Sequence, residues 1–173
     1  MAVVLIVAIL GALATYGVRK YLLAAKTSEA TQMLAAIASA QEQYRAETHS
    51  YLDVSGEKKL SGYAKFYPAT APLKRAKAAW GGATGVDADV AARWQMLGVK
   101  PTHPVHYIYG CAAGSVGDAV ADPGMTISGF PTGGDGQPWY IAQAVGDLDG
   151  DGEVGLWVLS SFSSQVFHTK EEE

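Results

Sequence analysis

The first eighteen residues form one uninterrupted apolar run. Met1 to Val18 contain no charged side chain, and Arg19 and Lys20 follow at once. At a rise of about 1.5 Å per residue, a helix of this length covers most of a bilayer core of about 30 Å. The sequence keeps a helical pattern beyond this point but becomes amphipathic. We therefore expect one continuous helix that begins as an apolar segment and continues into a soluble domain.

The second part of this helix, residues 22–54, is expected to turn one face towards a core. Its large apolar residues recur at spacings of three, four and seven, which places them on one helical face. An alanine-rich stretch between them permits close approach of another backbone. Gly56 and the polar residues around it are expected to end the helix. The residues predicted to form the helix-to-sheet core are Met33, Leu34, Ile37, Tyr44 and Tyr51.

The remainder, residues 55–173, reads as a globular head. Residues 87–97 predict a short helix with an Asp near its N-cap and Gly98 at its end. Apolar runs at 105–112, 139–145 and 154–160 predict strands, and residues 165–168 an edge strand. The predicted fold class is α+β, with a long N-terminal α-helix, apolar in its first half, packed on a small antiparallel β-sheet. The predicted segments are 1–21 (apolar half-helix), 22–54 (amphipathic half-helix) and 55–173 (head).

Charge is divided unevenly along the chain. Residues 1–100 hold twelve Lys and Arg against seven Asp and Glu, and residues 101–173 hold one against ten. The acidic second part argues against nucleic-acid binding, which requires basic patches that neutralise phosphates. It is consistent with a bound cation, with head-to-tail contact between copies, or with a solvated acidic surface.

The chain has a single cysteine and no recognisable catalytic motif. Cys111 cannot form an intramolecular disulfide, and its strand-like surroundings predict a small buried side chain, with a disulfide between chains as the alternative. The sequence has no nucleophile elbow and no glycine-rich phosphate loop. The acidic residues gather in turns, so we do not expect an enzyme or a catalytic residue.

Two segments near the start resemble a known family. The run MAVVLIVAILGALA resembles the membrane helix of type IV pilins and of the related pseudopilins of type II secretion, and KTSEA, at residues 26–30, resembles the segment that follows it there. The spacing from Met1 to Ser28 matches the family without a gap. On this resemblance the chain begins about six residues inside the mature family N-terminus. It lacks the N-methylated phenylalanine, the nearby glutamate and the leader peptide.

The resemblance implies a structural subunit of a type IV pilus or related surface filament. Such a subunit is held in the bacterial inner membrane, in contact with lipid and with the pilus or secretion assembly machinery. It then joins copies of itself in an extracellular filament through its N-terminal helix. The alternatives are a pseudopilin of a type II secretion system and a membrane-anchored monomeric binding domain. The residues expected to pack between helices are Val4, Ile6, Ile9, Leu10, Gly11, Leu13 and Gly17.

An acidic turn is the clearest chemical signal of the head. Carboxylates alternate along residues 147–153, and Gly152 permits a sharp bend, as at the start of an EF-hand loop. Val158 stands where an EF-hand has its bidentate glutamate, so flanking EF-hand helices are not expected. Resemblance to the calcium-binding major pseudopilins favours calcium, and the alternative is a solvated hairpin turn rich in Asp and Gly. The candidate ligands are Asp147, Asp149, Asp151, Glu153 and, from another loop, Asp135.

Overall fold

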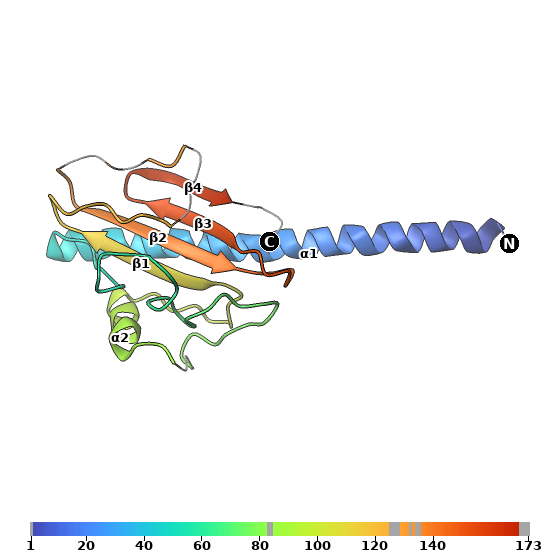
Figure 1. The fold of residues 1–173 in the computed structure, drawn as a ribbon, viewed down its shortest axis with the longest axis horizontal. Helices are drawn as coiled ribbons and strands as arrows, with labels where there is room; N and C mark the ends of the chain where they lie inside the picture. The colour runs from blue at the N-terminus through green and yellow to red at the C-terminus, as the bar shows by residue number, and fades with distance from the viewer. Residues whose placement is uncertain (1, 83–84, 125–128, 132, 134–135, 170–173) are drawn as a thin grey trace.

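The fold is one very long helix with a small globular head packed along its second half (Figure 1). The computed structural model describes residues 2–82, 85–124, 129–131, 133 and 136–169. The helices are α1 (Ala2–Thr48) and α2 (Ala88–Leu97). The strands are β1 (Ile108–Gly114), β2 (Trp139–Gly146), β3 (Gly155–Ser160) and β4 (Ser163–Thr169). The predicted α+β class, with a helix packed on an antiparallel sheet, is confirmed.

Helix α1 runs without a break through 47 residues. No proline occurs before residue 68, so nothing in this segment removes a backbone donor or forces a kink. Gly11 and Gly17 lie inside the helix and leave it intact. The helix ends at Thr48 rather than at the predicted residue 54, and no glycine marks this end. His49 instead adopts a left-handed conformation with φ of 62°, which turns the chain away from the helix axis.

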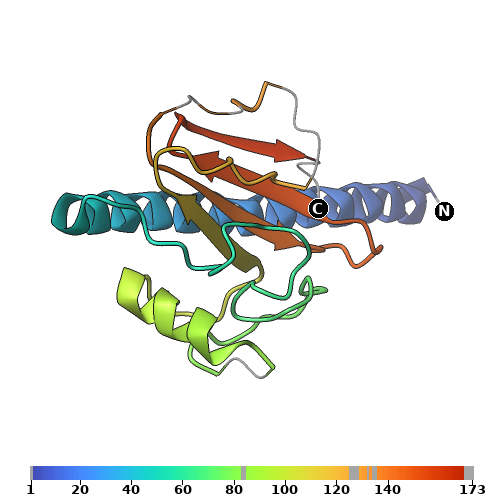
Figure 2. The ribbon, with the colours of Figure 1, turned by 60° about the vertical axis from the view of Figure 1, so that its left-hand side comes forward.

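The sheet is an antiparallel meander in which each strand pairs with the next one in sequence. Cys111 of β1 lies opposite Ala142 of β2, and Ala142 lies opposite Leu159 of β3. The pairing of β3 with β4 shifts register between Val158 and Ser160. Figure 2 shows the sheet lying across the second half of α1. Helix α2, in green, lies on the side of the sheet where β1 is the edge strand.

Buried side chains cover both faces of β1, β2 and β3, and every residue of these three strands is buried. One cluster fills the space between the sheet and α1 and includes Leu34, Ile37 and Trp157. The second lies on the opposite face, where Phe66 from the irregular segment after α1 covers the sheet. A Cβ at Gly110 would lie 2.8 Å from the Phe66 ring, so only glycine permits this close approach.

The short helix α2 has the predicted ends. Asp87 accepts a hydrogen bond at its N-terminus from the backbone N–H of Asp89, and Gly98 ends it with φ of 79°. Lys65 donates to Asp87 at 2.8 Å, which lowers the pKa of the Asp87 carboxyl. Val90, Trp94 and Leu97 are the buried residues of α2.

Candidate functional site

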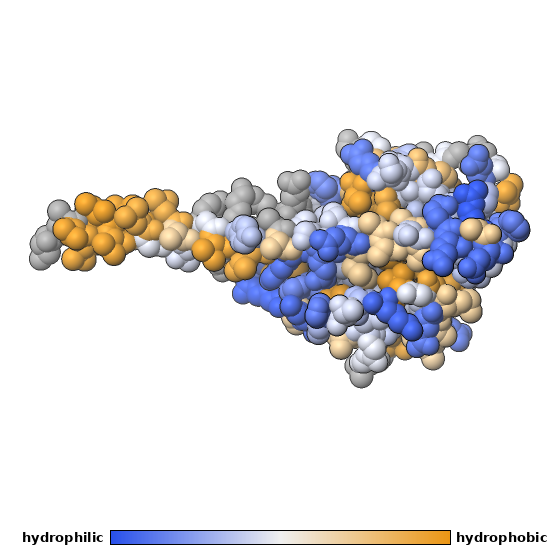
Figure 3. All heavy atoms as spheres, turned by 180° about the vertical axis from the view of Figure 1, so that it is seen from behind, coloured by the Kyte–Doolittle hydropathy of each residue, from blue (hydrophilic) through white to orange (hydrophobic). Residues whose placement is uncertain are grey.

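The first half of α1 extends beyond the head with its apolar side chains uncovered. In Figure 3 it is the orange projection, whereas much of the visible face of the head is blue or pale. Val7, Ile9 and Leu13 expose 62%, 53% and 64% of their surface. We call residues 3–18 the uncovered half-helix. Its predicted packing residues are all exposed: Val4, Ile6, Ile9, Leu10, Gly11, Leu13 and Gly17.

Exposed apolar side chains along a whole helix segment are unusual, because isolated soluble domains seldom expose contiguous apolar patches of more than a few hundred Å². The uncovered half-helix carries no charged residue. Within the described residues, no helix meets both the length and the hydropathy needed to cross a bilayer.

The second half of α1 is fixed to the head through its core face. Met33, Leu34 and Ile37 belong to the buried cluster between helix and sheet, and Tyr44 is half-buried against it. Tyr51 belongs to the same cluster but lies beyond the end of the helix. Its ring packs edge-on against Tyr140 of β2, with centroids 4.8 Å apart.

A polar contact reinforces this apolar packing where the helix enters the head. The carboxylate of Glu29 accepts a hydrogen bond from the backbone N–H of His106 at 2.7 Å, and its other oxygen lies 2.8 Å from His106 Nδ1. The hydroxyl of Tyr109 donates to Glu29 at 3.3 Å. Burial of Tyr109 raises the pKa of its hydroxyl, so it stays protonated as a donor. The sequence does not predict this cluster, because no local pattern joins residues so far apart in the chain.

A buried polar residue of α1, Gln41, was also not predicted. The side-chain amide of Gln41 donates to the carbonyl of Leu52 at 2.8 Å and accepts from its N–H at 2.9 Å. It therefore holds the chain that leaves the helix alongside the helix itself. Gln41 Nε2 also lies 3.1 Å from the sulfur of Cys111. The helical spacing could have predicted that Gln41 is buried, because it follows Leu34 and Ile37 on the core face of the helix.

The acidic turn joins β2 to β3 and brings three of its predicted ligands together. The carboxylates of Asp147, Asp149 and Asp151 each have an oxygen within 4.8 Å of the others. Asp147 is buried and accepts hydrogen bonds from the N–H groups of Gly150 at 2.7 Å and Gly152 at 3.2 Å. Asp149 is half-buried and Asp151 is exposed.

This spacing would admit a metal ion, of which calcium is one case. Calcium takes oxygen ligands at about 2.3–2.6 Å, so two oxygens on the same ion lie at most about 5 Å apart. The three carboxylates meet that limit and supply the charge that calcium favours. They are fewer than the six to eight ligands of a complete shell, so backbone carbonyls or water would supply the rest.

Of the other two predicted ligands, Glu153 is not part of this group of described residues. Glu153 contributes its backbone N–H, which donates to Asp151 at 2.7 Å, and its carboxylate lies outside the cluster of three. Asp135 lies outside the described residues. A positive side chain comes from elsewhere: a Cβ at Gly150 would lie 3.0 Å from Nε of Arg75, so this guanidinium lies over the turn.

Comparison with known protein families, with curated proteins and with solved structures finds no match to this chain. The two candidate sites therefore have to be judged by their own geometry. The uncovered half-helix has the character of an assembly surface, and the acidic turn has the donor set of a cation site.

Proposed function

We propose that the chain is the structural subunit of a type IV pilus or a related filament, with a pilin-like fold, and that copies assemble through their N-terminal helices. The observation that carries this proposal is the uncovered half-helix, which is continuous with the second half of α1, whose core face is buried against the head. A single rigid element thus connects a folded head to an apolar surface that the head does not cover.

The energetics favour burial of this helix in protein. At about 25 cal/mol per Å² of apolar surface removed from water, a helix of this length contributes on the order of tens of kcal/mol. That is ample for a filament that is hard to dissociate. The location of the subunit in the inner membrane before assembly stays a prediction from the sequence. The alternative of a pseudopilin involves the same helix packing and a shorter filament.

The test compares two valines of nearly equal exposure. Val7 lies in the uncovered half-helix and exposes 62% of its surface, and Val116 lies on the head and exposes 63%. Val7→Asp is expected to abolish assembly, because each filament contact would bury an unpaired carboxylate. Val116→Asp is expected to leave it unchanged. Sedimentation and electron microscopy of the two variants and the parent chain give the measurement.

Two results would contradict the proposal. One is a Val7→Asp variant that forms filaments as well as the parent chain does. The other is the absence of the chain from surface filaments sheared from the cells that make it, as judged by mass spectrometry. In that case the helix would be a tether for a monomeric head.

We also propose that the acidic turn binds calcium. The convergence of three carboxylate oxygens within 4.8 Å supports this, as does the burial of Asp147, which holds the turn in shape through two backbone N–H groups. The nearby Arg75 offsets part of the negative charge, so we expect moderate affinity. Calcium should raise the unfolding temperature, and a chelator should reverse the effect. A chain whose unfolding is indifferent to both would not be a calcium protein.

A further inference from the structure

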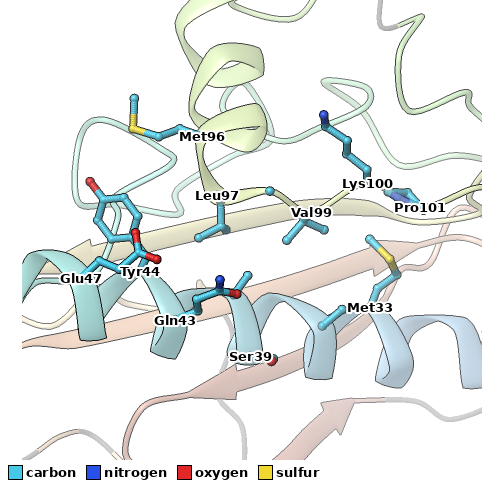
Figure 4. Close-up of a pocket in the computed structure, with 13 residues that line it drawn as sticks. Met33, Ser39, Gln43, Tyr44, Glu47, Met96, Leu97, Val99, Lys100 and Pro101 are labelled. Carbon is cyan, nitrogen blue, oxygen red and sulfur yellow. The ribbon is translucent and has the colours of Figure 1, made fainter.

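A groove runs along the head beside α1. One wall is a face of α1, with Met33, Ala36 and Ala40, and the other is the end of α2 and the chain after it, with Leu97 and Val99. Its volume is about 640 Å³. Figure 4 shows Tyr44, Glu47 and Met96 at one end and Met33, Lys100 and Pro101 at the other. We call it the α1–α2 groove.

We propose that the α1–α2 groove receives the uncovered half-helix of a second copy of this chain. The inference rests on the proposed filament function and names the receiving surface. Each wall carries buried apolar side chains, Met33 on one and Leu97 and Val99 on the other, and the polar residues Ser39 and Gln43 also line the groove. Ala36 and Ala40 are small, so a second backbone can approach α1 closely here.

The lengths of the two surfaces agree. From Met33 to Glu47 the groove follows fifteen residues of α1, a rise of about 21 Å at 1.5 Å per step. The uncovered half-helix rises about 22 Å from Val3 to Val18 by the same measure. A chain cannot fill its own groove, because both surfaces lie on one straight helix (Figure 1).

Charge sets the direction of the incoming helix. Glu47 lies at one end of the groove and Lys100 at the other (Figure 4). The apolar run is followed in sequence by Arg19 and Lys20. A parallel arrangement brings these two residues towards Glu47 and away from Lys100, whereas an antiparallel arrangement brings like charges together. The incoming helix is therefore parallel to the α1 that receives it.

This geometry produces an open assembly. The donating and receiving surfaces are different parts of each copy, so every contact leaves one half-helix and one groove available for the next copy. Such head-to-tail contacts form rings or helical filaments rather than closed two-fold dimers.

The first experiment blocks the groove. Ala36→Trp fills it with an indole, and Ala35→Trp places the same indole on the neighbouring exposed position of α1, which does not line the groove. Ala36→Trp is expected to raise the concentration needed for assembly by about tenfold or more. Ala35→Trp is expected to change it much less. Circular dichroism and unfolding temperature establish that both variants keep the fold.

The second experiment identifies the contact. Chains with Ala36→Cys are mixed with chains carrying either Ala8→Cys or Ala14→Cys and treated with a short bismaleimide. The native Cys111 is buried and does not compete. The parallel arrangement predicts a cross-linked product between positions 8 and 36, since an offset of about thirty residues aligns them. A product with position 14 instead would overturn the parallel direction.

The outcomes separate this inference from the proposed function. One outcome overturns the groove alone: the parent chain and Ala36→Trp assemble equally well, and neither mixture gives a cross-linked product. In that case the groove is not the receiving surface, and the filament proposal stands. If the parent chain does not assemble at all, both are overturned.

Discussion

Glu29 of α1 and His106 of the segment before β1 are joined by two contacts, at 2.7 Å to the backbone N–H and 2.8 Å to the ring Nδ1. They form a polar contact between helix and head beyond the uncovered half-helix. The side chains are 24% and 12% exposed, so water only partly screens them. The pair joins α1 to the chain before β1, in addition to the apolar packing of α1 on the sheet.

Replacing Glu29 should loosen the junction between helix and head. Glu29→Ala removes the partner of the His106 N–H, its ring and the Tyr109 hydroxyl, and we expect unfolding to become easier by about 1.5–3 kcal/mol. Glu29→Gln keeps an acceptor for the N–H and should lose less. Urea denaturation gives the values, with the exposed Gln32→Ala as control. Equal losses for the Ala and Gln variants would show that the carboxylate charge carries the whole effect.

Substitutions at two isoleucines of α1 should affect different properties, one the stability of the monomer and the other its assembly. Ile37 is fully buried between helix and sheet, whereas Ile9 is 53% exposed. Ile37→Ala is expected to lower the free energy of unfolding by about 2–5 kcal/mol, because it leaves a cavity in the core. Ile9→Ala should leave unfolding of the monomer unchanged and weaken assembly. Denaturation and sedimentation of both variants test this, and the reverse pattern would contradict the assignment of the two halves.

The periodic parts of the fold could be predicted from the sequence. Leu34 and Ile37 recur at helical spacing, and the apolar runs of β2 and β3 lie between glycine-rich turns, so local pattern sufficed. The end of α1 could not be predicted, because Gly56 offered a conventional stop signal. The actual stop is His49, held in a left-handed conformation that residues other than glycine seldom adopt.

The polar contacts of the site lay beyond local pattern. Glu29 meets His106 only because α1 and the chain before β1 come together in the tertiary structure. The acidic turn was recognisable as a cluster of carboxylates. Its geometry was not predictable, because it depends on how β2 and β3 end. Asp147 is buried and accepts from two backbone N–H groups, whereas Asp151 is exposed.

The single cysteine should be inert in the folded chain. Burial raises the pKa of the Cys111 thiol from about 9 to about 12, so the unfolded chain releases this proton first. The resulting stabilisation is complete below about pH 9 and is lost as the pH rises to about 12. Cys111→Ala should therefore make the alkaline loss of stability shallower. A thiol reagent at pH 8 should react only on unfolding, and rapid labelling of the folded chain would contradict this.

Calcium dependence should require the exposed member of the acidic turn. A ligand present at about one hundred times its Kd stabilises a fold by about 2.7 kcal/mol. Asp151→Asn should remove most of that gain. In the absence of calcium it should change the free energy of unfolding little. Asp122→Asn is the matched control, because Asp122 accepts a hydrogen bond from the N–H two residues ahead, as Asp151 does, but lies outside the cluster.

Thermal unfolding in calcium, magnesium and chelator gives the measurement. Magnesium demands a smaller, near-octahedral shell and should stabilise less. If both variants keep the full calcium response, the ion binds elsewhere. If neither they nor the parent chain respond, the acidic turn does not bind calcium.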